Sequence, residues 1–329
     1  MTAATELTRI SIITPCYTMD RLKDITELLD SIQAQSYKNI ETIIVAERSP
    51  ELEESVRNYA QEKDYPNVLV LYNQGEWGIS SARNLGIKEA SGEIIAFVDD
   101  DALLFPGWAE ETARAYAEDS SIIGLTGPIL PLWEDEAMNW FPREFYWIFS
   151  CTYWDWTEPT EVRNGYGTNV SFRRKAFDQC GLFKTNLGIK GYGKSGWQGL
   201  GGEETEFSIR VKRQTGERIV YHPNIKVKHK IYRYRFSSSF IRKRAYWEGQ
   251  AKAMFNKLYR SDHERILSTE HELLQRIFCK LIPSSIKLLF SQPKIALRQL
   301  LVTKLVLTCV AAGYLNYNLR NLRPIRRYS

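Results

Sequence analysis

Apolar and polar positions along the first hundred residues follow two different periods in turn. Four short apolar runs have the length and composition of buried strands, at 9–15, 41–46, 67–72 and 93–98. Three stretches between them carry apolar residues at helical spacing, at 22–36, 50–63 and 79–90. This repeated strand–helix order predicts an α/β fold with a Rossmann-like, mostly parallel sheet and right-handed crossovers.

The pattern loosens beyond residue 103. Aromatic residues and glycines gather in clusters, and the strict alternation of strand and helix stops. We interpret this region as an α+β half laid against the sheet. The predicted organisation is one domain over 1–272, with halves at 1–102 and 103–272, followed by a helical tail over 273–329.

The tail over 273–329 differs from the rest of the chain in charge. It holds ten lysines and arginines and no acid, so it carries +10, whereas residues 1–272 carry −5 and the whole chain +5. Leucine, isoleucine and valine alternate with these bases, which predicts two amphipathic helices lying on an anionic membrane surface. The longest uncharged apolar run, 305–315, is about half the ~20 residues that a membrane span needs, so a span is possible but surface docking is favoured. An ordinary amphipathic helix packed on the domain is the alternative.

Composition narrows the class of protein. Of 329 residues, 43% are apolar and 25% charged, which is typical of a globular chain and excludes a collagen-like one. The five cysteines are scattered without a CxxC pair, which favours a reducing compartment and argues against a disulfide framework or a structural zinc site. The first fifteen residues lack the regions of a secretory signal, so we expect a cytoplasmic protein, peripheral on the inner face of the cell membrane.

Three adjacent carboxylates, Asp99, Asp100 and Asp101, follow the fourth predicted strand. Ligands of parallel α/β sheets bind beyond the carboxyl ends of the strands, so this triplet lies at the edge where a site is expected. An Asp-x-Asp pair there can hold Mg²⁺ or Mn²⁺, which would neutralise a diphosphate leaving group. The alternative is a capping cluster at a strand–helix junction, although three acids that repel one another are costly for that role alone.

Four segments in order resemble the family 2 glycosyltransferases of the GT-A fold. They are ISIITPCYTMDR, GISSARNLGIKEASGEIIAFVDDDA, RNGYGTNVSFRRKAF and GGEETEFSIRV. The fuller motif set, which adds FPREFYW and VKHKIY, looks most like the dolichyl-phosphate-linked glucuronosyltransferases and their bacterial relatives. The resemblance implies a GT-A sheet in which 1–102 form the nucleotide-binding half and 103–272 the acceptor half.

The resemblance assigns roles to the three acids and to one histidine. By position, Asp99 matches the acid that contacts the nucleotide ribose, Asp100 lies beside it in the donor site, and Asp101 matches the metal-binding acid. His229 matches the histidine after the last strand of this fold, which completes metal or diphosphate binding. Without the resemblance, His229 would be interpreted as a surface histidine in a basic run.

The segment GGEETEFSIRV matches the family motif that supplies the general base. Glu203 takes the first position, on the acceptor side, and Glu204 the second, where the family has the base. A base is required because a sugar hydroxyl is a poor nucleophile until it loses its proton. With one base and no second carboxylate placed as a nucleophile, we expect a single displacement that inverts the anomeric centre. The alternative is a helix with solvated acids in its first turn, Glu206 among them.

Further matched positions concern the nucleotide. The family's second strand ends in an Asp pair followed by Gly-Ser, whereas this chain has Ala46 and Glu47 there. Glu47 is expected to accept a hydrogen bond from the base. Arg83 matches a family arginine near the nucleotide, with a helix-surface ion pair as the alternative. Pro15 and Tyr17 flank the strand end where the base would stack.

The segment GTNVSFRR resembles the acceptor side of the family. Gly167 permits close backbone approach, Asn169 offers hydrogen bonds, and Arg173 and Arg174 could face a phosphate on the acceptor. Trp197, in the glycine-rich loop, is expected to stack on a sugar face, with a packing role in the core as the alternative.

These features predict an inverting, metal-dependent glycosyltransferase of the hexosyltransferase type. It would move a sugar from a nucleotide-diphosphate donor to a lipid-linked, polysaccharide or other membrane-associated acceptor, with Mg²⁺ or Mn²⁺ as cofactor. The alternative is a non-catalytic sugar-nucleotide-binding or scaffold protein of the same fold, suggested by Ala46 and Glu47. A nucleic-acid partner is not expected, because the basic stretch 226–252 contains no known module and the acid triplet would be unexplained.

Overall fold

The chain forms two compact units in the computed structural model. The described residues are 8–188, 192–193, 196–197, 201–259 and 267–321. The first unit, here called the sheet unit, comprises the chain up to residue 132 together with 150–230. The second, the helical unit, comprises 133–149 together with 231–329. Segment 133–149 therefore leaves the sheet unit and the chain then returns to it, which no sequence pattern indicated.

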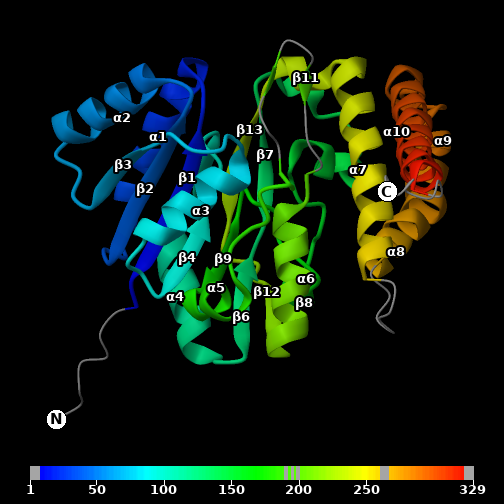
Figure 1. The fold of residues 1–329 in the computed structure, drawn as a ribbon. Helices are drawn as coiled ribbons and strands as arrows, with labels where there is room; N and C mark the ends of the chain where they lie inside the picture. Colours follow the sequence, from blue (N-terminus) through cyan, green and yellow to red (C-terminus); the bar gives the residue numbers. More distant parts are fainter. Residues whose placement is uncertain (1–7, 189–191, 194–195, 198–200, 260–266, 322–329) are drawn as a thin grey trace, which may run out of the picture. The chain divides into compact units, whose positions relative to one another are not determined.

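The first half of the sheet unit has the predicted strand–helix order (Figure 1). Its strands are β1 (Ile10–Cys16), β2 (Ile40–Glu47), β3 (Val68–Asn73) and β4 (Ile94–Phe97). Its helices are η1 (Met19–Arg21, a 3₁₀ turn), α1 (Leu22–Gln33), α2 (Pro50–Glu62) and α3 (Ile79–Glu89). The four strands run parallel in the order β3-β2-β1-β4. The predicted α/β fold with a mostly parallel sheet is confirmed.

Local sequence explains these elements. β1 and β2 are buried along almost their whole length, because both faces of the sheet are covered. Their sequences are therefore mostly apolar and do not alternate with polar residues. α1 buries Leu28 and Ile32 on one stripe and exposes its polar face. Ser49 caps α2 by accepting from the N–H of Leu52, and Pro50 begins the helix, where its missing N–H costs nothing.

Four further strands complete the sheet. They are β6 (Ile122–Thr126), β8 (Thr160–Val162), β9 (Val170–Arg173) and β12 (Arg218–Tyr221). The full order is β3-β2-β1-β4-β9-β6-β12-β8, with β9 antiparallel to both of its neighbours. The helices of this half are α4 (Trp108–Glu118), α5 (Arg174–Cys180) and α6 (Glu203–Thr215). Phe172, Phe177 and Phe207 form an aromatic core beside β9, with ring centroids 4.6–5.9 Å apart.

A second sheet of three strands continues the chain after the acid triplet. β5 (Ala102–Leu104) pairs antiparallel with β13 (Val227–Ile231), and β7 (Ile129–Trp133) lies on the other side of β13. The glycine-rich segment contains a small hairpin of β10 (Tyr192–Gly193) and β11 (Gly196–Trp197). The β5–β13 pairing brings the end of the sheet unit's sequence beside the triplet.

The helical unit is built from helices of three kinds (Figure 1). They are the 3₁₀ turns η2 (Glu136–Met138), η3 (Arg143–Phe149) and η4 (Arg233–Phe236), the π-helical turn η5 (Ile277–Leu281), and α7 (Ser238–Leu258), α8 (Ser268–Arg276), α9 (Ile282–Leu288) and α10 (Pro293–Arg320). Part of the aromatic crowding in the sequence packs here, since the ring centroids of Phe141, Phe149 and Phe236 lie 4.9–5.3 Å apart.

α7 and α10 approach each other closely at two glycines. A Cβ atom on Gly249 would lie 2.0 Å from the carbonyl oxygen of Val310, and one on Gly313 would lie 2.0 Å from the carbonyl oxygen of Tyr246. Small residues allow backbones to meet in this way where helices cross. Both positions therefore require glycine for the observed packing.

Gly249→Ala and Gly313→Ala are each expected to lower the free energy of unfolding by about 1–3 kcal/mol, because the added methyl group displaces backbone. The direction of the change in unfolding free energy tests the packing, since Gly→Ala in an unhindered helix stabilises by about 1 kcal/mol. Urea unfolding followed by circular dichroism measures the change, with Ala312→Ser at an exposed position of α10 as the control. A stabilised Gly313→Ala variant would contradict the described packing.

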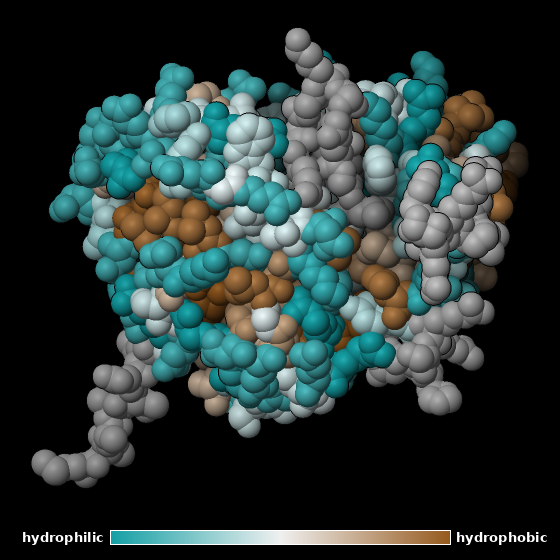
Figure 2. Space-filling model, viewed as in Figure 1, coloured by the Kyte–Doolittle hydropathy of each residue, from teal (hydrophilic) through white to brown (hydrophobic). Residues whose placement is uncertain are grey.

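α10 is the one helix in the described part of the chain that is long and apolar enough to cross a membrane, judged by length and composition. Only 22% of its apolar window is buried within the protein. Figure 2 shows apolar surface where Figure 1 places α9 and α10. Exposed large apolar side chains of α8 to α10 are Leu274, Phe278, Ile286, Phe290, Leu297, Leu301, Leu315 and Leu319. Lys304 is the single charge between 299 and 319, so the apolar stretch extends well beyond 305–315.

Candidate active site

Three ligand-type side chains meet beyond the carboxyl end of β4. Ligand atoms of Asp99, Asp101 and His229 all lie within 4.8 Å of one another. The two aspartates follow β4 directly, whereas His229 arrives on β13, where it pairs with Ala102. The N–H of Lys230 also donates to the carbonyl of Asp101 at 2.9 Å. Strand pairing therefore places the histidine, which is buried and not on the surface.

The His229 ring contacts a group at each nitrogen. Its Nε2 lies 2.8 Å from Oδ1 of Asp101, and its Nδ1 lies 3.8 Å from the sulfur of Cys151. Both His229 and Asp101 are 2% exposed. Carboxylate oxygens with one imidazole suit Mg²⁺ or Mn²⁺. For Nε2 to bind a cation, Nδ1 must carry the ring proton. The Cys151 sulfur is placed to accept a hydrogen bond from that N–H.

The electrostatics of the triplet also fit a cation. Burial raises the pKa of Asp100 well above its usual range, and the neighbouring charge of Asp101 raises it further, while Arg21 opposes both effects. Burial and the neighbouring carboxylate thus disfavour the charged form of Asp100. A divalent cation is the kind of group that offsets such repulsion.

Arg83 links the triplet to the start of α6. Its Nη2 lies 3.3 Å from Oδ1 of Asp99, and its Nη1 lies 2.7 Å from Oε1 of Glu203. The other oxygen of Asp99 accepts from the hydroxyl of Thr168 at 2.5 Å. Arg83 is 2% exposed, so the helix-surface ion pair considered for it is wrong. Buried pairs of this kind fix geometry, because removal of one partner leaves an uncompensated charge.

Gly167 gives Arg83 the space it needs. A Cβ atom on Gly167 would lie 2.2 Å from Nη2 of Arg83, so the close approach expected at this glycine is to a side chain of the protein itself. The guanidinium cannot move away without breaking its contacts to Asp99 and Glu203. The glycine therefore positions the arginine.

Gly167→Ala is expected to lower kcat/KM by up to about 100-fold, because displacement of Arg83 shifts groups at the site by a fraction of an ångström or more. Gly75→Ala adds the same methyl group at an exposed position with only an ordinary contact, and serves as the control. Initial rates and thermal unfolding of both variants separate loss of function from loss of fold. Equal rates for the two variants would exclude the positioning role.

Glu204 lies in the first turn of α6, directly after the buried Glu203. Gly202 precedes the helix with a φ of 100°, a left-handed conformation that favours glycine. Successive helical side chains point about 100° apart, so Glu203 can face Arg83 while the half-buried Glu204 faces elsewhere. The expectation of a solvated Glu206 is wrong: it is fully buried and pairs with Lys184 and Arg210.

Three residues of the GTNVSFRR segment do not face a ligand. Asn169 is buried, accepts from Nε1 of Trp108 at 3.0 Å and donates to the carbonyl of Ile225 at 2.8 Å, so its amide is used within the fold. Arg173 and Arg174 end β9, and because β9 is antiparallel to β4 they lie at the opposite edge of the sheet from the triplet. There both donate to backbone carbonyls. The expected acceptor-phosphate contact is therefore withdrawn.

The remaining predicted positions lie at or near the same strand ends. Glu47 ends β2, is buried, and accepts from Nδ2 of Asn73 at 2.7 Å and from the N–H of Gly78 at 3.1 Å, so it organises the loop after β3. Pro15 and Tyr17 are half-buried at the end of β1. The backbone of Trp197 lies in β11, but its side chain lies outside the described residues.

Two residues at the site were not assigned from the sequence. Arg21 lies 3.2 Å from Oδ2 of Asp101, and Thr168 donates to Asp99. Both occur inside quoted motifs, MDR and GTNVSFRR, so membership of a motif was the available signal. Which motif residues face the triplet depends on the fold.

Residues 11–181, just over half of the chain, match the family model described as "Glycosyl transferase family 2". The chain belongs to this family. This chain is also 30% identical over 308 residues to the glucosyl-dolichyl phosphate glucuronosyltransferase of Haloferax volcanii. The aligned region covers 93% of this chain and 95% of the relative. The predicted resemblance is confirmed, and the protein is a glycosyltransferase.

Solved structures share the fold of this family 2 glycosyltransferase. Mannosyltransferase PcManGT from Pyrobaculum calidifontis, solved with GDP-Man and Mn²⁺, aligns with a TM-score of 0.62 at 17% identity, covering 94% of this chain and 88% of that one. GalNAc-T7, solved with UDP, GalNAc and Mn²⁺, aligns at 0.54 and 16% identity, covering 82% and 54%. At these identities the likeness concerns the fold alone, which is the predicted GT-A type.

Proposed function

We propose that this glycosyltransferase moves a sugar from a nucleotide-diphosphate donor to a lipid-linked acceptor with inversion, using Mn²⁺ or Mg²⁺. The observation that carries the proposal is the meeting of Asp99, Asp101 and His229 beyond β4. PcManGT and GalNAc-T7 were solved with a nucleotide sugar or a nucleotide together with Mn²⁺, which supports the proposed donor and metal. The name of the Haloferax relative supports a lipid-linked acceptor.

Each of the site residues would have a separate role in the transfer. Asp101 and His229, with Asp99 beside them, would hold the cation, which would neutralise the charge that develops on the departing diphosphate. Arg83 fixes Asp99 relative to the start of α6. Glu204, in that first turn, would take the proton from the attacking acceptor hydroxyl.

A donor screen tests the proposal. Binding and hydrolysis of UDP-, GDP- and dTDP-sugars are measured with Mn²⁺, with Mg²⁺ and with EDTA. We expect one nucleotide to bind in a metal-dependent way, and turnover to need a lipid-phosphate acceptor. Metal-independent turnover at full rate would contradict the role of the Asp–Asp–His cluster.

The exposed apolar face of α8 to α10 and the basic tail support docking on anionic membranes. Removal of 273–329 would cut α8 and delete α10, which packs on α7, so point variants are the better test. Phe290, which is 93% exposed, and Leu301, 66% exposed, are replaced together by serine. We expect the affinity for vesicles, measured by flotation, to fall by about 100-fold or more, since each of the two large apolar side chains contributes about 1.5–3 kcal/mol when buried. Unchanged flotation would place the membrane contact elsewhere.

A further inference from the structure

Arg21 contacts the candidate metal ligand Asp101 on the side opposite His229. Its Nη1 lies 3.2 Å from Oδ2 of Asp101, while Nε2 of His229 lies 2.8 Å from Oδ1. The Arg21 side chain is only 11% exposed. Both oxygens of Asp101 therefore already contact groups of the protein, and one of those groups is permanently cationic.

Arg21 is held in place by further charges. Its Nη1 lies 2.9 Å from Oδ2 of Asp24, a buried residue of α1 that also accepts from Nζ of Lys230 at 2.7 Å. Lys230 pairs with Glu27 as well. Charges thus alternate from Asp101 through Arg21, Asp24 and Lys230 to Glu27.

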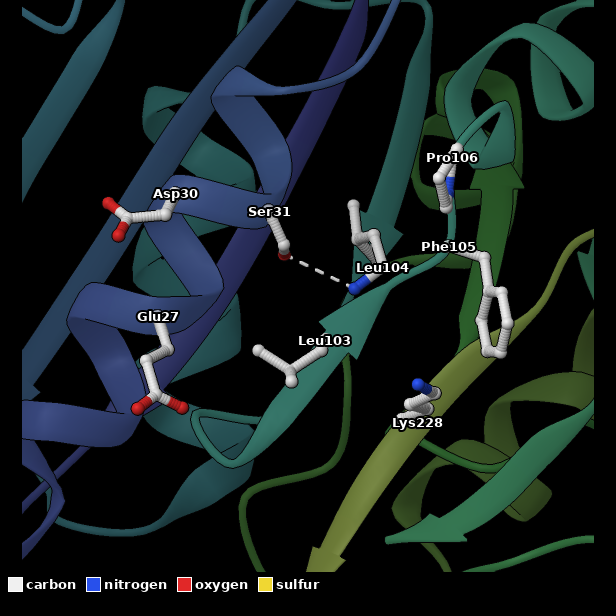
Figure 3. A pocket seen from close by; sticks show the side chains of 8 residues that line it. All are labelled: Glu27, Asp30, Ser31, Leu103, Leu104, Phe105, Pro106 and Lys228. Atoms are coloured by element: carbon white, nitrogen blue, oxygen red, sulfur yellow. Dashed lines mark hydrogen bonds between the residues drawn. The ribbon is translucent and has the colours of Figure 1, made fainter.

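The outer end of this row of charges borders a hollow (Figure 3). Glu27 lines a cavity of about 330 Å³ between α1 and the β5–β13 ribbon, where Ser31 accepts from the N–H of Leu104 at 3.2 Å. Leu104 of β5 and Lys230 of β13 thus both bind residues of α1. Arg21 cannot move away from the site without losing its ion pair with Asp24.

We infer that Arg21 makes cation binding at Asp101 conditional on the donor's diphosphate. A divalent cation and a guanidinium that share one carboxylate repel each other, and a nearly buried site screens this repulsion weakly. A diphosphate supplies negative oxygens to both, and guanidinium groups pair well with phosphate. The metal alone should therefore bind weakly, and the metal with a nucleoside diphosphate strongly. This inference rests on the proposed function.

The test measures Mn²⁺ binding by the electron paramagnetic resonance signal of the free ion, with no turnover required. Wild type and Arg21→Gln are titrated with Mn²⁺ alone and in the presence of UDP, GDP or dTDP. Without nucleotide, Arg21→Gln is expected to bind Mn²⁺ about tenfold more tightly than wild type does. This factor lies within the usual 5–150-fold range of coupling between ligands. The gain in Mn²⁺ affinity that the nucleotide gives should shrink by a similar factor.

A second variant predicts the opposite sign. Asp24→Asn removes a charge that compensates Arg21, so it should weaken binding of Mn²⁺ alone, while Lys230 keeps its partner Glu27. If Arg21 only orients Asp101, both variants should weaken Mn²⁺ binding. Arg114→Gln removes an exposed arginine of α4 that pairs with Glu111 and Glu118, away from the triplet, and should leave Mn²⁺ binding unchanged.

The outcomes are distinguishable. Mn²⁺ that does not bind wild type with any of the three nucleoside diphosphates overturns the proposed function, and this inference with it. Mn²⁺ that binds wild type, but binds Arg21→Gln alone equally or more weakly, overturns the inference and leaves the proposed function intact. Tighter binding to Arg21→Gln with weaker binding to Asp24→Asn supports it.

Discussion

Asp101→Ala is expected to lower kcat by roughly 1,000-fold or more. Without this carboxylate the cation is lost, and the diphosphate would depart with its charge uncompensated, which removes several kcal/mol of transition-state stabilisation. The fold should survive, because Arg21 retains its contact with Asp24. Single-turnover transfer to acceptor and Mn²⁺ titration of the variant measure both losses.

The control for this variant is Asp178→Ala, which removes an exposed acid of α5. It should keep wild-type turnover and Mn²⁺ affinity. His229→Ala should show a smaller loss in the same direction, since Asp99 and Asp101 remain as ligands. An Asp101→Ala enzyme that turns over at the wild-type rate in EDTA would contradict the assignment of Asp101 as a metal ligand.

Glu204→Gln is expected to lower kcat by roughly 10²–10⁴-fold, the usual contribution of a general base. Glutamine keeps the size and hydrogen bonding of the side chain but cannot accept the proton. Donor affinity should barely change, because Asp99 and the cation would hold the nucleotide. Rapid-quench kinetics and donor titration separate the two effects, and Glu89→Gln, at an exposed position of α3, is the control.

The same experiment tests the stereochemistry. One base and a single displacement should convert an α-linked nucleotide sugar into a β-linked product, which NMR of the product identifies. A covalent route would need a second carboxylate at the anomeric carbon. Glu203, the neighbouring candidate, is bound to the buried Arg83. An α-linked product, or Glu204→Gln at full rate, would remove Glu204 from the mechanism.

The site could be predicted from the sequence to the extent that it depends on local chain order. The triplet's place at the sheet edge follows from the apolar run 93–98 and the rule for parallel sheets. Arg173 and Arg174 were assigned wrongly, because β9 runs antiparallel to β4 and carries them to the opposite edge of the sheet. Asn169 lies at the triplet's edge, but its amide forms hydrogen bonds within the fold. Glu206 was expected in solvent, yet Lys184 approaches it from outside its helix.

The sequence by itself determined the first four strands with their helices, the position of the acid triplet and the family. These depend on periodicity and motifs, which neighbouring residues carry. Only the tertiary structure decided how these side chains are brought together: His229 reaches Asp101 through the β5–β13 pairing, and Arg83 joins Asp99 to Glu203 in the space that Gly167 leaves. Such contacts between distant segments form where buried charges find partners, and no local pattern encodes that choice.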